Sequence, residues 1–152
     1  MERLIYQFFS DDDFLRISTQ IKKAEKTTSG EIRISIKEDR PFVDKGKTIR
    51  QLAEKEFYKL NMHKTRDKTG ILLFLLLYER QFYILADQSI NDKVTKATWY
   101  SVRDEVQEKF HDGNFCDGML AGVVRIGEIL SEHFPAKADD TNELSNKIVM
   151  ER

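Results

Sequence analysis

The chain has almost no cysteine: Cys116 is the single one among its 152 residues. One cysteine excludes an intrachain disulfide and any site in which several thiolates hold zinc or an iron–sulfur cluster. The chain also lacks an excess of charge of one sign, because 25 Lys and Arg stand against 26 Asp and Glu. This balance gives no reason to expect a nucleic-acid partner.

Long hydrophobic runs are missing as well. The longest one, residues 71–78, is far shorter than the roughly 20 apolar residues that span a bilayer. The opening stretch MERLIYQFFSDDD has no basic region followed by an apolar one, so it does not have the pattern of a secretory signal. We therefore expect a cytoplasmic protein without a membrane span.

The sequence contains enough apolar residues, 40%, for one domain with a real core. Four segments have the apolar spacing of helices that lie on such a core: about 10–28, 45–60, 92–110 and 115–134. Ser10 is a natural N-cap, and Gly30 is expected to end the first helix in the left-handed conformation. The glycines inside the last helix are expected to pack against the sheet.

Three segments have the pattern of strands. Residues 31–36, EIRISI, alternate strictly between apolar and polar side chains. The continuous apolar run at 71–78 favours a central strand that is covered on both faces. The third segment, QFYILAD, follows after only Glu79 and Arg80, and so short a link requires an antiparallel hairpin.

The element order is therefore α-β-α-β-β-α-α. This order predicts an α/β fold, a three-layer α/β/α sandwich in which helices cover both faces of a small mixed sheet. The first two strands, joined by a helix, should be parallel with a right-handed crossover. Residues 1–134 form the predicted domain, and 135–152 are a polar, mobile tail in which Leu144 and residues 148–150 could form a short docking helix.

The predicted topology brings three acidic residues to one edge of the sheet. Glu31 opens the first strand, Asp67 precedes the second, and Asp87 closes the third, which returns to the same edge; Asp92 follows shortly after. Carboxylates that lie close together favour a hard divalent cation, calcium or magnesium. The alternative is that each acid is an ordinary solvated strand or loop end.

Four stretches occur in a fixed order: AEKTTSGEIRISI, KTRDKTGILLFL, ERQFYILADQSIND and VQEKFHDGNFCDGMLAGV. In order and spacing they resemble the successive motifs of the TPM domain, a family named for thylakoid lumen, photosystem II repair and worm acetylcholine-receptor regulator proteins. The resemblance covers about residues 11–134 and is closest to small standalone bacterial members.

This resemblance implies an α/β/α sandwich that binds calcium or another divalent cation, and the acid-phosphatase activity of plant members. By position, Ser29 and Glu31 match the family's helix-to-strand motif, Asp67 precedes the central strand, and Asp87 and Asp92 match the end of the hairpin and the loop beyond. Thr69 stands where Asn is usual, and ADQS where many members have a glycine-rich turn, which argues against a tight phosphate-binding loop. Many relatives carry a signal peptide and a C-terminal membrane segment, and this sequence shows neither.

Two functions are compatible with these residues. The favoured one is a non-catalytic binding or regulatory module, a monomer that takes up a divalent cation and has a possible protein partner; its metal ligands would be Glu31, Asp67, Asp87 and Asp92. The alternative is a metal-dependent acid phosphatase, in which phosphate would contact Ser29, Arg66 and Lys68. The binding module is favoured because no base lies next to Ser29 in the sequence and no histidine acid/base pair is evident.

Overall fold

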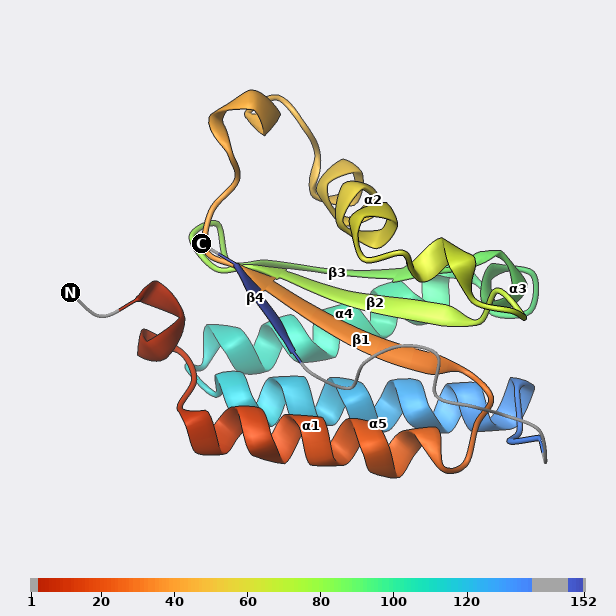
Figure 1. Ribbon diagram of the computed structural model, residues 1–152. Coiled ribbons are helices and arrows are strands. Elements are labelled where there is room, and N and C mark those ends of the chain that lie inside the picture. The colour runs from red at the N-terminus through yellow and green to blue at the C-terminus, as the bar shows by residue number, and fades with distance from the viewer. Residues whose placement is uncertain (1–2, 138–147, 152) are drawn as a thin grey trace.

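The protein is a three-layer α/β/α sandwich in a computed structural model that describes residues 3–137 and 148–151 (Figure 1). The middle layer is a sheet with the strand order β3-β2-β1-β4. The strands are β1 (Glu31–Lys37), β2 (Gly70–Leu76), β3 (Gln81–Ala86) and β4 (Val149–Glu151). The predicted fold class is confirmed.

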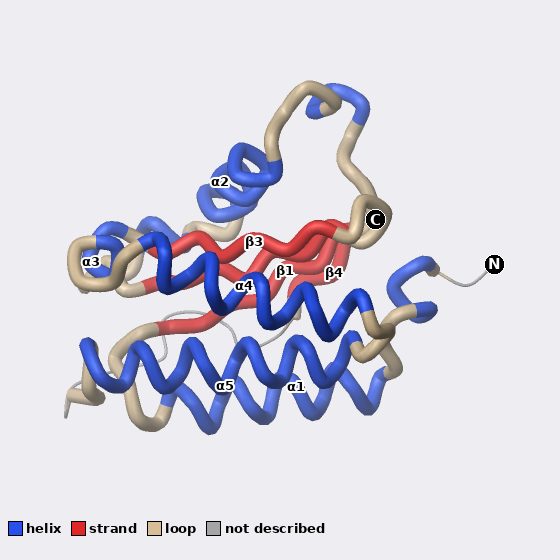
Figure 2. The backbone as a smooth tube through the Cα atoms, turned by 180° about the vertical axis from the view of Figure 1, so that it is seen from behind, coloured by secondary structure: helices blue, strands red, loops and turns tan. Residues whose placement is uncertain are grey.

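Helices cover the two faces of the sheet unequally (Figures 1 and 2). One face carries α1 (Asp11–Glu25), α4 (Lys96–His111) and α5 (Phe115–His133), and the other carries α2 (Ile49–Lys59). A four-residue helix, α3 (Gln88–Asn91), lies at the end of the sheet where β3 finishes. None of the helices in the described ranges is both long and apolar enough to cross a membrane.

Strand pairing follows the prediction. β1 and β2 are parallel, with Glu31 opposite Gly70, and β2 and β3 are antiparallel, with Ile71 opposite Ala86. Every residue of β2 is buried, as expected for a strand between two neighbours and beneath helices on both faces. The predictions of a central β2 and of a β2–β3 hairpin are therefore confirmed.

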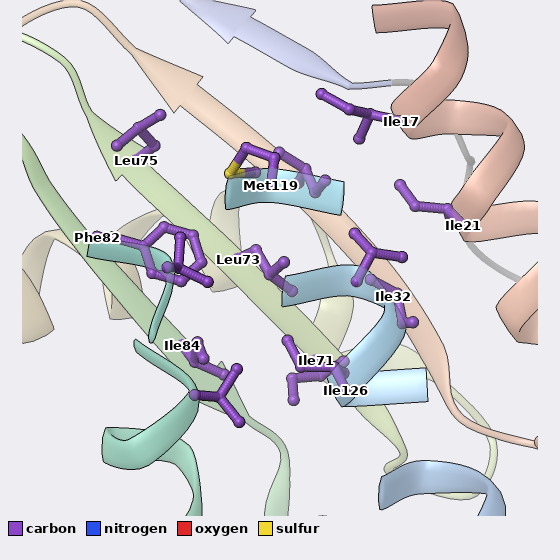
Figure 3. Close-up of a cluster of buried hydrophobic side chains, with 14 of the residues drawn as sticks. Ile17, Ile21, Ile32, Ile71, Leu73, Leu75, Phe82, Ile84, Met119 and Ile126 are labelled. Carbon is purple, nitrogen blue, oxygen red and sulfur yellow. The ribbon is translucent and has the colours of Figure 1, made fainter. Parts of the chain in front are cut away.

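The core is divided by the sheet into two clusters. On the three-helix face, Ile32, Ile71 and Leu73 pack with Ile17 and Ile21 of α1 and with Met119 and Ile126 of α5 (Figure 3). On the other face, alternate residues of β2 pack against the inner side of α2; they are Leu72, Phe74 and Leu76. The continuous apolar run thus supplies both cores, because successive side chains of a strand point to opposite faces.

Helix α1 begins as predicted but ends earlier. Ser10 and Asp13 form a capping box, in which each backbone N–H donates to the other's side chain. The helix ends at Glu25, and its C-cap Lys26 is right-handed, so the prediction that Gly30 terminates the helix is wrong. Gly30 instead lies close to α5, since an added Cβ would lie 2.9 Å from a terminal methyl group of Leu130.

Two other helix predictions have wrong starting points, because threonine caps were overlooked. Thr48 caps α2 in a capping box with Gln51, so the helix begins at Ile49 and not near residue 45. Thr95 accepts a hydrogen bond from the Thr98 N–H and starts α4 at Lys96, which leaves 88–91 as the separate helix α3. By contrast, α5 spans nearly the predicted residues.

The glycines of α5 contact helices and not the sheet. A Cβ on Gly122 would lie 2.9 Å from Val106 of α4, and one on Gly127 would lie 2.9 Å from the Cβ of Ala24 in α1. The expectation of packing against the sheet is therefore wrong: the absent side chains allow α1 and α4 to approach α5 closely.

The last described residues form a strand and not a helix. β4 pairs in parallel with β1, with Ser35 opposite Val149 and Lys37 opposite Glu151. The Glu151 carboxylate accepts hydrogen bonds from the ammonium groups of Lys37 and Lys59, at 2.9 and 2.8 Å. The predicted docking helix at 148–150 is thus wrong, since the edge of β1 offers these residues backbone partners; Leu144 lies outside the described residues.

Candidate functional site

One edge of the sheet collects the segments that carry the predicted acidic residues. Glu31 and Gly70 pair at the starts of β1 and β2, and the Asp87 N–H donates to the Gly70 carbonyl at 2.9 Å. Asp67 belongs to the turn before β2. In the part of the chain that the structure describes, no group of three or more His, Cys, Asp or Glu lies close enough to hold a metal ion. The segments converge without forming a ready-made metal cage.

A pocket of ≈ 530 Å³ opens beside this edge. Oxygen-bearing side chains line part of it: Ser29, Asp67, Thr69, Ser89 and Asp92. Three nitrogen-bearing side chains also line it, Lys93, His133 and Lys137, together with the apolar residues Phe134, Pro135 and Ala136. The pocket therefore offers both acidic oxygens and cationic groups to a ligand.

The wall of the pocket is built where the chain leaves α5. The Ser29 N–H donates to the Phe134 carbonyl at 2.9 Å, and the Thr28 hydroxyl donates to the same oxygen. An isolated β-bridge joins Thr28 to Pro135. These bonds hold the residues after α5 against the start of β1, so a segment distant in sequence closes one side of the site.

Asp67 is an acidic residue of the pocket whose carboxylate has two cationic side chains beside it. The Arg66 guanidinium donates to its Oδ2 at 2.9 and 3.2 Å, and the Lys137 ammonium lies 3.6 Å from the same atom. The Arg66 hydrogen bonds hold the pKa of the Asp67 carboxyl below its usual range. Asp67 is therefore ionised at neutral pH, but its charge is already compensated.

Asp87 and Asp92 flank the short helix α3. Asp87 is its N-cap: Oδ1 accepts the Gln88 N–H at 2.7 Å, while Oδ2 is buried and has no hydrogen-bond partner among the described residues. Asp92 follows the helix and is exposed at the pocket. Of the four predicted ligands, Asp67 and Asp92 line the pocket, whereas Asp87 and Glu31 do not.

Glu31 lies next to a second carboxyl that the sequence interpretation missed. Glu31 is 6% exposed, and Glu25 at the end of α1 accepts the Ile32 N–H at 2.8 Å. Burial, with a smaller contribution from the nearby Glu31 charge, raises the pKa of Glu25 to about 7, although the hydrogen bond from the Ile32 N–H acts in the opposite direction. The sequence did contain a sign of this pair, because Glu25 lies in the last turn of the helix that precedes the strand opened by Glu31.

The three residues predicted to contact phosphate are placed differently from one another. Ser29 lines the pocket, and its carbonyl accepts a bond from the Thr69 hydroxyl. The Arg66 guanidinium pairs with Asp67. The Lys68 ammonium donates to the His63 carbonyl, away from the pocket lining. Lys93 and Lys137 supply the cationic groups of the pocket instead, with His133 beside them in its lining, and local sequence patterns gave no sign of this.

Comparison with known proteins gives a consistent result. The family model of the TPM domain matches residues 6–129. The NMR structure of the BA42 protein from the psychrophilic bacterium Bizionia argentinensis is 31% identical, covers 99% of each chain and has a TM-score of 0.86.

Two further NMR structures are similar in fold alone. The N-terminal domain of a P. gingivalis protein is 13% identical, with a TM-score of 0.69 over 84% of this chain and 79% of that one. The N-terminal domain of the cg2496 protein from Corynebacterium glutamicum is 12% identical, with a TM-score of 0.60 over 93% and 80%. No match was found among curated proteins.

Proposed function

Since the chain belongs to the TPM domain family, we propose that it is a binding or regulatory module that takes up a divalent cation, calcium or magnesium, in the pocket beside β2. The observation that carries the proposal is that Asp67 and Asp92, from two different loops, line one pocket together with three hydroxyl-bearing residues. Hard divalent cations prefer oxygen ligands of this kind.

The oxygen ligands of the pocket fit a cation that keeps much of its hydration shell when it binds. Two carboxylates line the pocket, and the described residues contain no three-ligand cluster, so a closed calcium cage does not fit. Magnesium commonly binds through one or two carboxylates and retains several waters.

A cation between Asp67 and Asp92 would join the loop before β2 to the end of α3. Asp67 would have to exchange part of its contact with Arg66 and Lys137 for the ion, which predicts modest affinity. Because the unfolded chain lacks this arrangement, binding would raise the stability of the native state by mass action.

A backbone NMR titration of the full chain with calcium and with magnesium tests this proposal. We expect shifts at millimolar cation that concentrate near residues 67 and 92, and a higher melting temperature. D67N and D92N should each weaken binding by roughly tenfold, because each removes a charged oxygen ligand. D104N, an exposed change in α4, is the matched control and should bind like the original chain.

Two results would contradict cation binding at this site. One is the absence of shifts and of thermal stabilisation at millimolar calcium and magnesium. The other is unchanged affinity in both D67N and D92N, which would place the ion elsewhere.

The second candidate is a metal-dependent acid phosphatase that uses the same pocket. The specific observation in its favour is that Lys93, His133 and Lys137 line the pocket and could neutralise a phosphate ester. The hydrolysis of p-nitrophenyl phosphate by the purified chain, with and without chelator, separates the two functions. Turnover that is lost with chelator and in K93Q supports the phosphatase, and cation binding without turnover supports the binding module alone.

A further inference from the structure

The edge of β1 holds a short extended segment, the strand β4 (Figure 1). The two strands are parallel and pair only along Ser35–Lys37, whereas β1 pairs with β2 along its whole length. Beyond this short ladder, the Glu38 N–H donates to the Glu151 carbonyl at 2.8 Å. A sheet edge that holds a segment through so short a ladder can pair with another extended segment in its place.

This edge binds an acidic side chain between two lysines. Glu151 is the register partner of Lys37, so the two side chains lie on the same face of the sheet. Its carboxylate accepts hydrogen bonds from the ammonium groups of Lys37 and of Lys59 in α2, and neither lysine forms another ion pair within the described ranges. Burial acts to raise the pKa of Glu151, but the hydrogen bonds from the two lysines hold it below its usual range. The position therefore favours an ionised carboxylate.

Two buried polar atoms on the same face are not satisfied by β4. Ser35 is 0% exposed and Glu56 of α2 is 4% exposed, and the Ser35 hydroxyl and Glu56 Oε1 have no hydrogen-bond partner among the described residues. Glu56 lies near the ion pairs, since burial raises its pKa, the Glu151 charge raises it further and Lys59 opposes both. The register partner of Ser35 is Val149, which has no polar side-chain atom to offer. Buried polar groups are nearly always hydrogen-bonded, so these two point to a partner that β4 does not supply.

We propose that this edge of β1 docks an extended segment of a partner protein in place of β4. The segment would carry a serine or threonine opposite Ser35 and an aspartate or glutamate opposite Lys37. Facing residues on neighbouring strands lie about 5 Å apart, so a hydroxyl at the position of Val149 can reach the Ser35 hydroxyl. The backbone ladder supplies affinity, and the two side chains supply specificity. β4 holds the site when no partner is bound, because its glutamate fits although its valine leaves Ser35 unsatisfied.

The docking site and the cation pocket lie at different ends of β1. β4 pairs with the C-terminal end of the strand, whereas the pocket is lined by Ser29 and Thr69, which precede β1 and β2 (Figure 1). A segment paired with Ser35–Lys37 therefore leaves the pocket open. The inference does not depend on cation binding.

Fluorescence anisotropy of short labelled peptides with the full chain tests the proposal. The parent peptide is SNKIVMER, the sequence of residues 145–152. SNKITMER supplies the threonine opposite Ser35, and SNKITMKR also replaces the acid by lysine. The site is opened by E151K, which sets a third ammonium group beside Lys37 and Lys59 and so releases β4.

We expect SNKITMER to bind E151K at least about tenfold more tightly than it binds the original chain, because the chain's own segment no longer competes. On E151K, SNKITMER should bind about threefold more tightly than SNKIVMER, through the added hydrogen bond. SNKITMKR should bind at least about tenfold more weakly than SNKITMER. E151K/K59Q should bind SNKITMER about threefold more weakly than E151K does.

The matched control is E132K, a charge reversal at an exposed position of α5, which should bind the peptides like the original chain. Circular dichroism verifies the fold of each variant. A second measurement uses the original chain alone: saturating SNKITMER should shift the NMR signals of the Met150 and Glu151 amides, because β4 leaves the sheet.

Three results would overturn the proposal. The first is the absence of SNKITMER binding to both E151K and the original chain. The second is equal affinity of E151K for SNKITMER and for either of the other two peptides, because one of the two specificity positions would then have no effect. The third is a concentration-dependent dimer of the original chain that E151K abolishes, without any peptide binding, because the occupant would then be a second copy.

Discussion

At the scale of single residues, Glu25 is the side chain that we expect to affect the pH dependence of stability most. It lies where the last turn of α1 meets the first residues of β1, and burial raises the pKa of its carboxyl to about 7. The unfolded chain would titrate this carboxyl near its ordinary value of 4.5. Between these two pH values the folded state binds more protons than the unfolded state, so stability must fall as pH rises through this window.

We predict that E25Q flattens this pH dependence. The free energy of unfolding of the original chain should decrease from pH 5 to pH 7, whereas the amide does not titrate and still accepts the Ile32 N–H. Denaturant unfolding at pH 5, 6, 7 and 8 measures the difference. E132Q, an exposed change in α5, should keep the original slope. Equal slopes for E25Q and the original chain would show that Glu25 is not the responsible group.

At the scale of elements, the close approach of α1 to α5 depends on a missing side chain. A Cβ on Gly127 would lie 2.9 Å from the Cβ of Ala24, which is too close for two carbon atoms and cannot be relieved by rotating a flexible side chain. Either the helices separate or the new side chain is strained, and both outcomes weaken the three-helix layer.

We therefore predict that G127V lowers the free energy of unfolding by about 2 kcal/mol or more, from overpacking and from the weak helix preference of valine. Chemical denaturation measures the loss. G46V is the matched control, because nothing lies within 4 Å of an added Cβ there, and it should change stability by less than about 0.5 kcal/mol. If G127V lowered the free energy of unfolding as little as G46V does, α1 and α5 would be able to separate freely.

At the scale of the whole molecule, the end of the chain returns to the sheet beside β1. β4 pairs with Ser35–Lys37, the Glu38 N–H donates to the Glu151 carbonyl at 2.8 Å, and Glu151 bridges Lys37 of the sheet and Lys59 of α2. These contacts tie the C-terminal strand to two layers of the sandwich.

Truncation after Ile148 should lower the free energy of unfolding by about 2 kcal/mol, since several backbone hydrogen bonds and two ion pairs are lost. E151Q keeps the strand and removes only the charge, so its loss should be at most about 1 kcal/mol and should shrink at high salt. Thermal and denaturant unfolding of both variants measure these losses. Equal stability of the truncated and full chains would show that β4 contributes nothing.

The sequence by itself determined the three long strands, the hairpin and the three-layer class. Three local patterns carried this information: the alternation in 31–36, the apolar run at 71–78 and the two-residue link after it. Each pattern predicts structure directly, because the backbone geometry of a strand or a hairpin involves only residues that are near one another in sequence. Helix starts at Thr48 and Thr95 were also encoded locally, but the capping residues were overlooked.

Only the tertiary structure decided what surrounds the site. β4 is three residues long, too short for any periodicity, and it forms because the edge of β1 offers hydrogen-bond partners. His133 and Lys137 share a pocket with Asp67 because the end of α5 and the residues after it are bonded to the residues before β1. Periodicity reports which face of an element is apolar; it carries no information on which distant side chains share a pocket, because that depends on how the packed layers bring separate loops together.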